Sequence, residues 1–229
     1  LTKMLSKVNF NKDFKEYISM LENWDNKLLK NSVEATIYVN FERKLISSFN
    51  KEYVPKEVRN LLWVQLYRII EKINSFEVND RNNFLKKVFI SSLQDLKNRL
   101  GDNVDEWIYG QSNYKHIKIS HLLDDIVNDS IGKIISFKTY PRGGNGYTPG
   151  STSSSLNQSS GASFRVIIDT KDWDNSIATN SPGQSGNPES PFYRNLYESW
   201  ANDEYFKLLY SKSLIENNSY NNIVYYPKK

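Results

Sequence analysis

The chain has two histidines, His116 and His121, and their spacing indicates whether they could bind the same metal ion. The alternation of polar and apolar residues between them predicts a strand, and an odd separation on a strand places two side chains on opposite faces. We therefore expect them not to share a metal ion. Asp124 and Asp125 could add carboxylate ligands, but their spacing matches no familiar metal-binding pattern. The sequence has no cysteine, which excludes disulfides, thiolate metal sites and a cysteine nucleophile.

Two glycine-rich segments have the composition of functional turns but lack the required spacing. A nucleophile elbow needs a glycine two residues before and two residues after the serine, whereas Gly186 follows Ser185 directly in the segment 183–186. The segment 143–146 (Gly-Gly-Asn-Gly) could hold a phosphate through backbone N–H groups, but it lacks the remaining residues of a P-loop or a dinucleotide-binding turn. We interpret both as structural turns. The residues alone single out no Ser/His/Asp triad, and we assign no catalytic, cofactor-binding or metal-binding residue.

The composition indicates a folded protein without a nucleic-acid partner. The chain has 229 residues, enough for one large domain or two small ones, and 14% of them are aromatic. Thirty Lys and Arg against 26 Asp and Glu give a net charge of +4, and the basic residues are scattered singly rather than clustered. No run of about 18 apolar residues is present, so we expect no membrane span.

Residues 1–105 are predicted to form a mainly helical region. Between about Phe14 and Leu100, apolar residues recur at helical spacing in four sets, which we assign to core packing. These sets are Tyr17, Leu21 and Trp24; Ile37, Phe41, Leu45 and Phe49; Leu62, Leu66, Ile69, Ile70 and Ile73; and Phe84, Val88, Ser92 and Leu96. Asp80 and Gly101 are predicted cap residues, and Pro55 is predicted to precede a helix start.

Residues 106–229 are predicted to form a β-rich region with a C-terminal helix, so the fold class is α+β. Predicted strands are 116–120, 133–137 and 164–169, the last of them mostly buried, and 192–209 is predicted to be helical. The Gly- and Ser-rich segment 141–163 is compatible with either a linker or a long loop.

Five blocks of the sequence resemble, in the same order, segments of the penicillin amidase family, which also includes cephalosporin and acyl-homoserine lactone acylases. The blocks are Leu21-Glu22-Asn23-Trp24-Asp25 with Ser32, Ala35 and Ile37-Tyr38; Trp107-Ile108-Tyr109-Gly110 with His116 and His121-Leu122-Leu123; Gly143 to Thr148; Gly161 to Asp169; and Trp173 to Ser176, continuing through Pro182 to Pro188, Ser190-Pro191, Tyr193 and Trp200. They cover about residues 15 to 210. Asn145, Pro149-Gly150 and Phe192 depart from the family's usual residues.

The resemblance implies part of the αββα four-layer sandwich of N-terminal nucleophile hydrolases. In this family a self-cleaving precursor frees a serine whose own α-amine acts as general base, while a backbone N–H and an Asn side chain stabilise the oxyanion and an Arg positions that Asn. These groups precede the first block in the family's order, and Leu1 has no heteroatom with which to attack. We therefore expect this chain to be the C-terminal part of the catalytic beta subunit, inactive alone, with no cofactor.

The expected partners are the remaining segments of the same precursor, namely the alpha subunit and the N-terminal part of the beta subunit, together with a small-molecule amide substrate. A non-catalytic binding or interaction module descended from the family is the alternative. The segment 161–169 is expected to be a central strand, 182–191 a rigid turn, and Arg165 to pair with Asp169 or Asp174. Localisation stays open, with a lean towards an extracytoplasmic protein.

Overall fold

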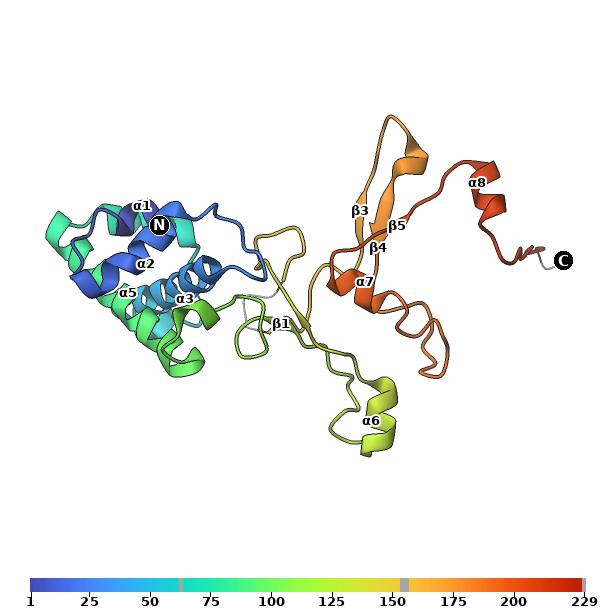
Figure 1. Ribbon diagram of the computed structural model, residues 1–229, viewed down its shortest axis with the longest axis horizontal. Helices are drawn as coiled ribbons and strands as arrows, with labels where there is room; N and C mark the ends of the chain where they lie inside the picture. The colour runs from blue at the N-terminus through green and yellow to red at the C-terminus, as the bar shows by residue number, and fades with distance from the viewer. Residues whose placement is uncertain (62–63, 153–156, 228–229) are drawn as a thin grey trace. The chain divides into compact units, whose positions relative to one another are not determined.

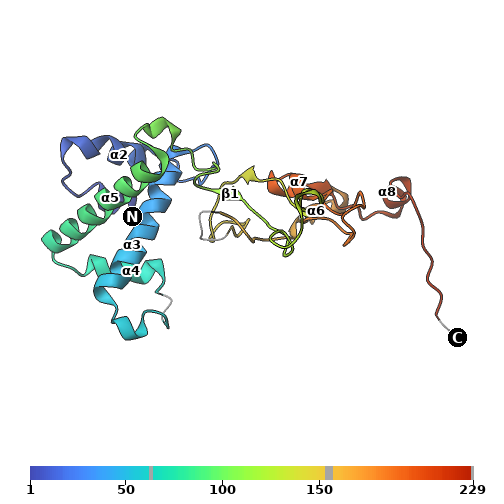
Figure 2. The same cartoon turned by 90° about the horizontal axis from the view of Figure 1, so that it is seen from below.

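The computed structural model describes residues 1–61, 64–152 and 157–227. The chain divides into two compact units: unit 1 contains residues 1–116 and 141–144, and unit 2 contains residues 117–140 and 145–229. Figures 1 and 2 show that unit 1 is built from helices, whereas unit 2 contains short strands, short helices and long connecting segments. Leu62, which belongs to the third predicted helical set, and residues 153–156 of the predicted loop or linker lie outside the described residues.

The described part of unit 1 contains five α-helices and two short 3-10 helices. They are α1 (Thr2–Leu5), α2 (Lys12–Asn23), α3 (Val33–Tyr53), η1 (Lys56–Val58), α4 (Leu66–Asn74), α5 (Val78–Leu100) and η2 (Val104–Glu106). The two long helices α3 and α5 pack side by side, as both views show. The helical spacing of the apolar residues thus predicted α2 to α5 correctly.

The core of unit 1 lies along the contact between α3 and α5. Phe41 of α3 and Phe89 of α5 are fully buried, and their ring centroids are 5.4 Å apart in an edge-to-face arrangement. Phe10, which precedes α2, also packs edge-to-face on Phe89, and these two ring centroids are likewise 5.4 Å apart. Edge-to-face rings add a specific orientation to the general gain from burial, so these side chains fix how the helices pack.

The ends of α5 show how its sequence limits the helix. Gly101 is the C-cap, with φ of 89°, and its N–H donates to the Lys97 carbonyl at 2.9 Å, as predicted for a glycine at this position. Asp80 lies in the first turn, where its charge suits the helix dipole, but the N-cap itself is Glu77. The predicted cap residue, Asp80, therefore lies three positions after the N-cap that the structure shows.

Unit 2 and its junctions with unit 1 contain the short strands and the remaining helices. The elements are β1 (His116–Ile117), α6 (Asp129–Ile135), β2 (Tyr140–Pro141), β3 (Arg165–Ile167), η3 (Trp173–Asn175), β4 (Ile177–Thr179), α7 (Tyr197–Ala201), β5 (Phe206–Lys207) and α8 (Lys212–Asn217). Strand β1 pairs with β2, and the order β3-β4-β5 forms an antiparallel three-stranded sheet.

Two secondary-structure predictions for this region were wrong. The segment 133–137 was predicted as a strand, but most of it belongs to α6, because the Asn128 side chain caps that helix by accepting from the Ile131 N–H at 3.1 Å. The segment 192–209 was predicted as one helix, but α7 covers only five residues of it. Asp203 follows with φ of 60°, a left-handed conformation that a continuing helix cannot contain, and the chain then enters β5.

The core of unit 2 is small and aromatic. Tyr197 and Trp200 of α7 are buried, and Phe137 packs edge-to-face on Tyr197 with ring centroids 4.8 Å apart. Strand β3 lies outside this core: Val166 is 41% exposed, so the prediction of a mostly buried strand at 164–169 does not hold for the part of the chain that the structure describes. Among the described residues, no helix is both long and apolar enough to cross a bilayer.

Candidate functional site

Two of the sequence blocks meet at the loop that leads into α3. The Tyr109 N–H donates to the Ser32 carbonyl at 3.1 Å, and the Gly110 N–H donates to the Lys30 carbonyl at 2.6 Å. A Cβ atom on Gly110 would lie 2.5 Å from the Lys30 Cβ and 2.8 Å from its carbonyl oxygen, distances that no side chain tolerates. The glycine of the Trp-Ile-Tyr-Gly block is therefore required by a close backbone approach.

A third block reaches the same loop from residues 143 and 144. The Gly144 N–H donates to the Leu28 carbonyl at 2.8 Å, and the Tyr109 hydroxyl donates to the Gly144 carbonyl at 2.7 Å. Gly144 has φ of 75°, and a Cβ on Gly143 would lie 2.5 Å from the Leu28 oxygen. The backbone groups of this turn therefore hold the loop, which is compatible with the structural turn expected from the sequence.

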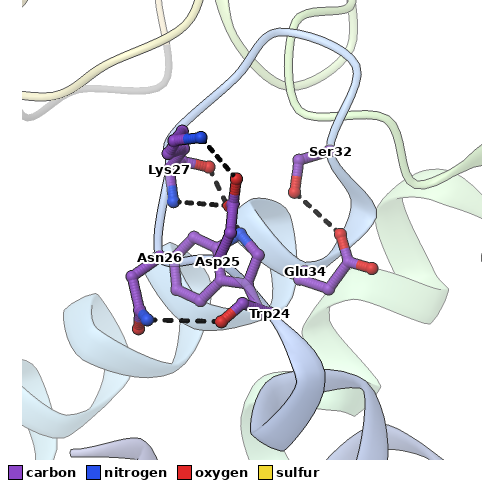
Figure 3. A network of polar contacts seen from close by, with 6 residues as sticks. All are labelled: Trp24, Asp25, Asn26, Lys27, Ser32 and Glu34. Atoms are coloured by element: carbon purple, nitrogen blue, oxygen red, sulfur yellow. Dashed lines mark hydrogen bonds and ion pairs between the residues drawn. The ribbon is translucent and has the colours of Figure 1, made fainter.

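The turn that begins this loop is closed by its own polar side chains (Figure 3). Asp25 accepts from the Lys27 N–H at 2.9 Å and lies 3.1 Å from its ammonium group. The Trp24 indole donates to the Lys27 carbonyl at 3.2 Å, while Asn26 adopts φ of 62° and donates to the Trp24 carbonyl. The Lys27 N–H, and secondarily its side chain, lower the pKa of Asp25. The Trp-Asp pair thus shapes a turn.

Ser32 completes this block as the N-cap of α3. Its hydroxyl accepts from the Ala35 N–H at 3.0 Å and donates to the Glu34 carboxylate at 2.8 Å (Figure 3). The spacing Ser-x-x-Ala is therefore explained by helix capping, in which the side-chain oxygen satisfies an N–H that the helix leaves unpaired.

His116 and His121 belong to different units, and His121 and Asp124 take part in local hydrogen bonds. His116 is buried in β1, in unit 1, whereas His121 belongs to unit 2 and accepts from the Leu123 N–H at 3.1 Å. Asp124 accepts from the His121 N–H at 3.0 Å and from the Ser136 hydroxyl at 3.0 Å. Within residues 1–61, 64–152 and 157–227, no group of three or more His, Asp or Glu side chains could hold a metal ion.

The segment around Ser185 is a tight turn held by one carbonyl group. The N–H groups of Gln184 and Ser185 both donate to the Phe192 carbonyl, at 2.8 and 3.1 Å. The backbone at Gly183 runs directly against the backbone of residues 192 and 193, so a side chain there would overlap it. The Ser185 hydroxyl accepts from the Asn187 N–H at 3.1 Å. This serine shapes the turn, and its surroundings lack the geometry of a nucleophile elbow.

Arg165 has a different partner from those predicted. Its guanidinium pairs with Asp203 and donates to the Trp200 carbonyl at 2.5 Å, and it lies 5.6 Å from the centre of the Trp200 ring. The predicted partners Asp169 and Asp174 instead accept backbone N–H groups. Arg165 therefore ties β3 to the end of α7.

Asp174 joins the β3–β4 connection to the segment after β5. One of its carboxylate oxygens accepts from the Tyr210 N–H at 2.8 Å and from the Ser211 N–H at 2.9 Å. These N–H groups lower the pKa of Asp174, because they stabilise its ionised form.

Lys115, in unit 1, is a buried cation that the sequence analysis missed. Burial, together with the nearby Arg43 and Arg142, lowers the pKa of its amine to about 8. Such a shift occurs at catalytic amines, but Lys115 lines none of the cavities described below. No feature of the local sequence distinguishes a buried lysine from the many exposed ones, since its burial depends on residues far away along the chain.

Cavities occur in both units. In unit 1, neighbouring grooves of about 390 and 340 Å³ follow α3 and α5 and share Glu52, Phe84 and Lys87. In unit 2, a pocket of about 220 Å³ is lined by Ile119, Phe137, Ser160, Gly161, Ser163, Ser181, Pro182, Tyr197 and Trp200. Burial, and then Tyr140, raise the pKa of the Tyr197 phenol to about 12, so it remains neutral and donates to the Lys138 carbonyl at 2.9 Å. The pocket is thus uncharged and mainly apolar.

Comparison with known proteins identifies the family to which these blocks belong. The sequence model described as penicillin amidase matches residues 1–217. Among solved structures, a thermostable penicillin G acylase from Alcaligenes faecalis aligns with a TM-score of 0.52 and 13% identity, over 99% of this chain and 45% of the acylase chain. At this identity the likeness concerns the fold alone. The chain thus spans less than half of that acylase chain, and no curated protein matches its sequence.

Proposed function

The chain belongs to the penicillin amidase family, and we propose that it forms the C-terminal part of the catalytic subunit of an amidohydrolase. The reaction would be the hydrolysis of linear, non-peptide amide bonds in N-acylated substrates. The observation that carries this proposal is the family match over residues 1–217, which contains the three blocks joined at the loop 28–32.

The proposed chemistry depends on groups outside these 229 residues. A serine at the N-terminus of the processed subunit would attack the amide carbonyl, and its own α-amine would accept the hydroxyl proton. An α-amine suits this role because its ordinary pKa of about 8 lies close to neutral pH, so about a tenth of it is already unprotonated at pH 7 and able to accept a proton. A backbone N–H and an Asn side chain would stabilise the oxyanion.

The chain itself would act as the scaffold of the subunit. Its characteristic glycines allow close backbone approaches at Gly110 and Gly183, and Ser32 and Asp25 shape the entry to α3. In this proposal the β3–β4–β5 sheet contributes to the four-layer αββα sandwich, and the remaining precursor segments supply the other strands and the acyl-binding pocket. Linear amides with an aromatic or aliphatic acyl group are the proposed substrate class.

The test compares the product of the complete gene with the 229-residue chain. Both are incubated with a chromogenic N-acyl anilide, and the N-termini of the full product are sequenced. We expect self-cleavage that exposes a terminal serine, amide hydrolysis by the processed protein, and none by the 229-residue chain. Replacing that serine by alanine is the matched control and should abolish both cleavage and hydrolysis.

Two results would contradict the amidase proposal. Hydrolysis that survives replacement of the terminal serine would exclude the proposed mechanism. An intact precursor without any hydrolysis would favour a non-catalytic binding or interaction protein that keeps only the family's fold.

A further inference from the structure

An aromatic cluster lies in unit 1, where the end of α3 meets the first part of α5. The ring centroid of Tyr53 is 5.1 Å from that of Phe76 and 5.6 Å from that of Phe84, and the two Phe centroids are 6.5 Å apart. Phe84 is buried, Phe76 is half-buried and Tyr53 is 41% exposed. The cluster therefore joins the core on one side and offers aromatic surface to solvent on the other.

These three rings line the larger of the two grooves of unit 1, which has a volume of about 390 Å³. Its other lining residues are polar or charged, namely Glu52, Glu77, Asp80, Asn83 and Lys87. We call this cavity the aromatic groove. A volume of several hundred cubic ångströms, with aromatic walls and a few polar groups, is typical of sites for small molecules.

The aromatic groove carries a negative charge. Three carboxylates line it, those of Glu52, Glu77 and Asp80. Lys87 supplies the one ammonium group among its described lining residues, 3.6 Å from the Glu52 carboxylate. The Lys87 side chain is 76% exposed, so this ion pair is weak and its cation can turn towards solvent. Within the part of the chain that the structure describes, Glu77 and Asp80 have no ion-pair partner, so two carboxylates stay uncompensated.

Helix α5 does not account for this charge. Glu77 is its N-cap, but among the described residues the Glu77 side chain makes no capping hydrogen bond. The dipole at a helix N-terminus favours negative charge and is equivalent to roughly half a positive charge, which the carboxylates of Glu77 and Asp80 together exceed. The dipole also gives no reason for three aromatic rings to lie beside the acids.

The adjoining groove of unit 1, of about 340 Å³, has a different chemistry. Lys51 and Lys87 line it, and Glu52 is the one acid among its described lining residues. Phe84 is its one described aromatic residue. The two grooves thus separate charge along α3 and α5, and the exposed aromatic rings lie at the acidic end.

We propose that the aromatic groove binds a small organic cation, namely a quaternary or alkyl ammonium ion. Its charged end would lie over the rings of Tyr53 and Phe76, because the face of an aromatic ring is negative and attracts a cation. Glu77 and Asp80 would balance the charge from the rim. A bare metal ion fits this groove less well, since hard cations require several oxygen ligands and the rings of Phe76 and Phe84 supply none.

This site goes beyond the proposed amidase reaction and does not depend on it. All of its residues lie between Glu52 and Lys87, and none belongs to the proposed catalytic groups. A ligand there would be recognised by charge and aromatic contact rather than by an acyl group.

Isothermal titration calorimetry of the complete gene product with choline tests the site. The control ligand is the uncharged carbon analogue of choline, in which a tert-butyl group replaces the trimethylammonium group. Phe76→Leu keeps an apolar side chain but removes an aromatic face, and the double variant E77Q/D80N removes two charges at nearly constant shape. The matched control is D13N/E16Q, which makes the same charge change on the exposed side of α2. Circular dichroism checks that each variant is folded.

We expect saturable binding of choline and at least about tenfold weaker binding of the uncharged analogue. Phe76→Leu and E77Q/D80N should each weaken choline binding by about three- to tenfold, whereas D13N/E16Q should leave it unchanged. Raising the salt concentration to about 1 M should also weaken binding, because the Debye length then falls to about 3 Å.

Several results would overturn the proposal. Equal affinity for choline and its uncharged analogue would remove the role of charge, and unchanged affinity in both groove variants would place choline elsewhere. Absence of binding to the folded complete product would exclude the site, and binding by the 229-residue chain alone would mean that another segment of the precursor fills the groove. Amide hydrolysis is measured separately. Choline binding without hydrolysis would preserve this site and remove the amidase reaction, and hydrolysis without choline binding would do the reverse.

Discussion

The two units of the chain bury their apolar residues to very different extents. Among the described residues, the largest fully buried side chains, including Trp107, Phe41 and Phe89, all belong to unit 1. Most of the exposed large apolar side chains, such as Phe164 and Ile168, belong to unit 2. The helices of unit 1 bury their apolar stripes against one another, whereas the sheet of unit 2 leaves an apolar side uncovered.

The difference arises because a pair of helices and a small sheet bury their apolar residues in different ways. A pair of long amphipathic helices such as α3 and α5 supplies both surfaces of its contact from one region of the chain. A three-stranded sheet supplies only one surface and needs a second layer from elsewhere. The predictions below test this comparison.

The largest expected effect concerns two tryptophans in contrasting surroundings. Trp107 is fully buried, stacks on Tyr17 at 5.9 Å and donates to the Gly101 carbonyl at 3.0 Å, so Trp107→Ala should lower the free energy of unfolding by about 3–5 kcal/mol. The same change at Trp173, which is 53% exposed in unit 2, should cost less than about 1 kcal/mol. Urea denaturation measures both, and equal losses would refute the contrast in packing.

A glycine substitution tests whether unit 2 is loosely packed throughout. Gly183→Ala should destabilise by about 1–3 kcal/mol, because the new methyl group would lie 2.5 Å from the Tyr193 carbonyl oxygen. Gly186→Ala is the control from the same turn, since nothing lies within 4 Å of its Cβ position. Thermal unfolding should separate the two variants. A harmless G183A would mean that this turn is as loosely packed as the exposed strand β3.

A pH-dependent effect is expected in the densely packed unit 1. The pKa of Lys115 is about 8 in the folded protein and 10.5 ordinarily, so the unfolded state binds more protons between these values. The unfavourable contribution of Lys115 is therefore fully present below pH 8 and disappears as the pH rises to 10.5.

Lys115→Met should consequently raise the free energy of unfolding by about 1 kcal/mol at pH 7, because an apolar chain replaces a buried charge. This gain should shrink between pH 8 and pH 10.5. The exposed Lys118→Met variant is the control and should follow the unsubstituted protein. A gain that is independent of pH would contradict the role of charge. Chemical denaturation across this pH range supplies the data.

The smallest expected effects come from helix caps in the two units. Ser32→Ala should cost about 1 kcal/mol, because it leaves the Ala35 N–H at the start of the long helix α3 without its partner. Asn128→Ala removes the corresponding cap of α6, a seven-residue helix that buries only Ile135, so the loss should be a few tenths of a kcal/mol. Differential scanning calorimetry can rank the stability losses of the two variants. A larger loss for Asn128→Ala than for Ser32→Ala would contradict the contrast between the two units. Ser32→Asp should restore the cap.

The elements that the sequence predicted well are those that bury one face over several turns. Four sets of apolar residues at helical spacing correspond to α2 through α5, since a stripe of that length cannot fit another periodicity. The segment 133–137 misled because its isoleucines favour strands, while the deciding residue, Asn128, lies outside the segment as a cap. Short elements depend on such single contacts, which periodicity does not contain.

The candidate site could be predicted only in part. The order of the family blocks identified the family, and the glycine turns, which the sequence analysis interpreted as structural, make close backbone contacts. Arg165 was paired with nearby acids, yet its partner Asp203 is 38 residues away along the chain. The contact of Gly110 with Lys30 likewise joins loops separated by helices α3 to α5. Such contacts follow from the tertiary fold, and no local pattern in the sequence specifies them.

The turn at residues 143 and 144 also affects the order in which the chain acquires its structure during synthesis. Unit 1 includes residues 141–144, which follow the excursion of residues 117–140 into unit 2. The ribosome synthesises the chain from its N-terminal end. The hydrogen bond from the Gly144 N–H to the Leu28 carbonyl therefore cannot form until residues 117–140 and Gly144 itself have left the exit tunnel. A nascent chain that stops at residue 116 thus has its helices but lacks the segment that closes the loop before α3.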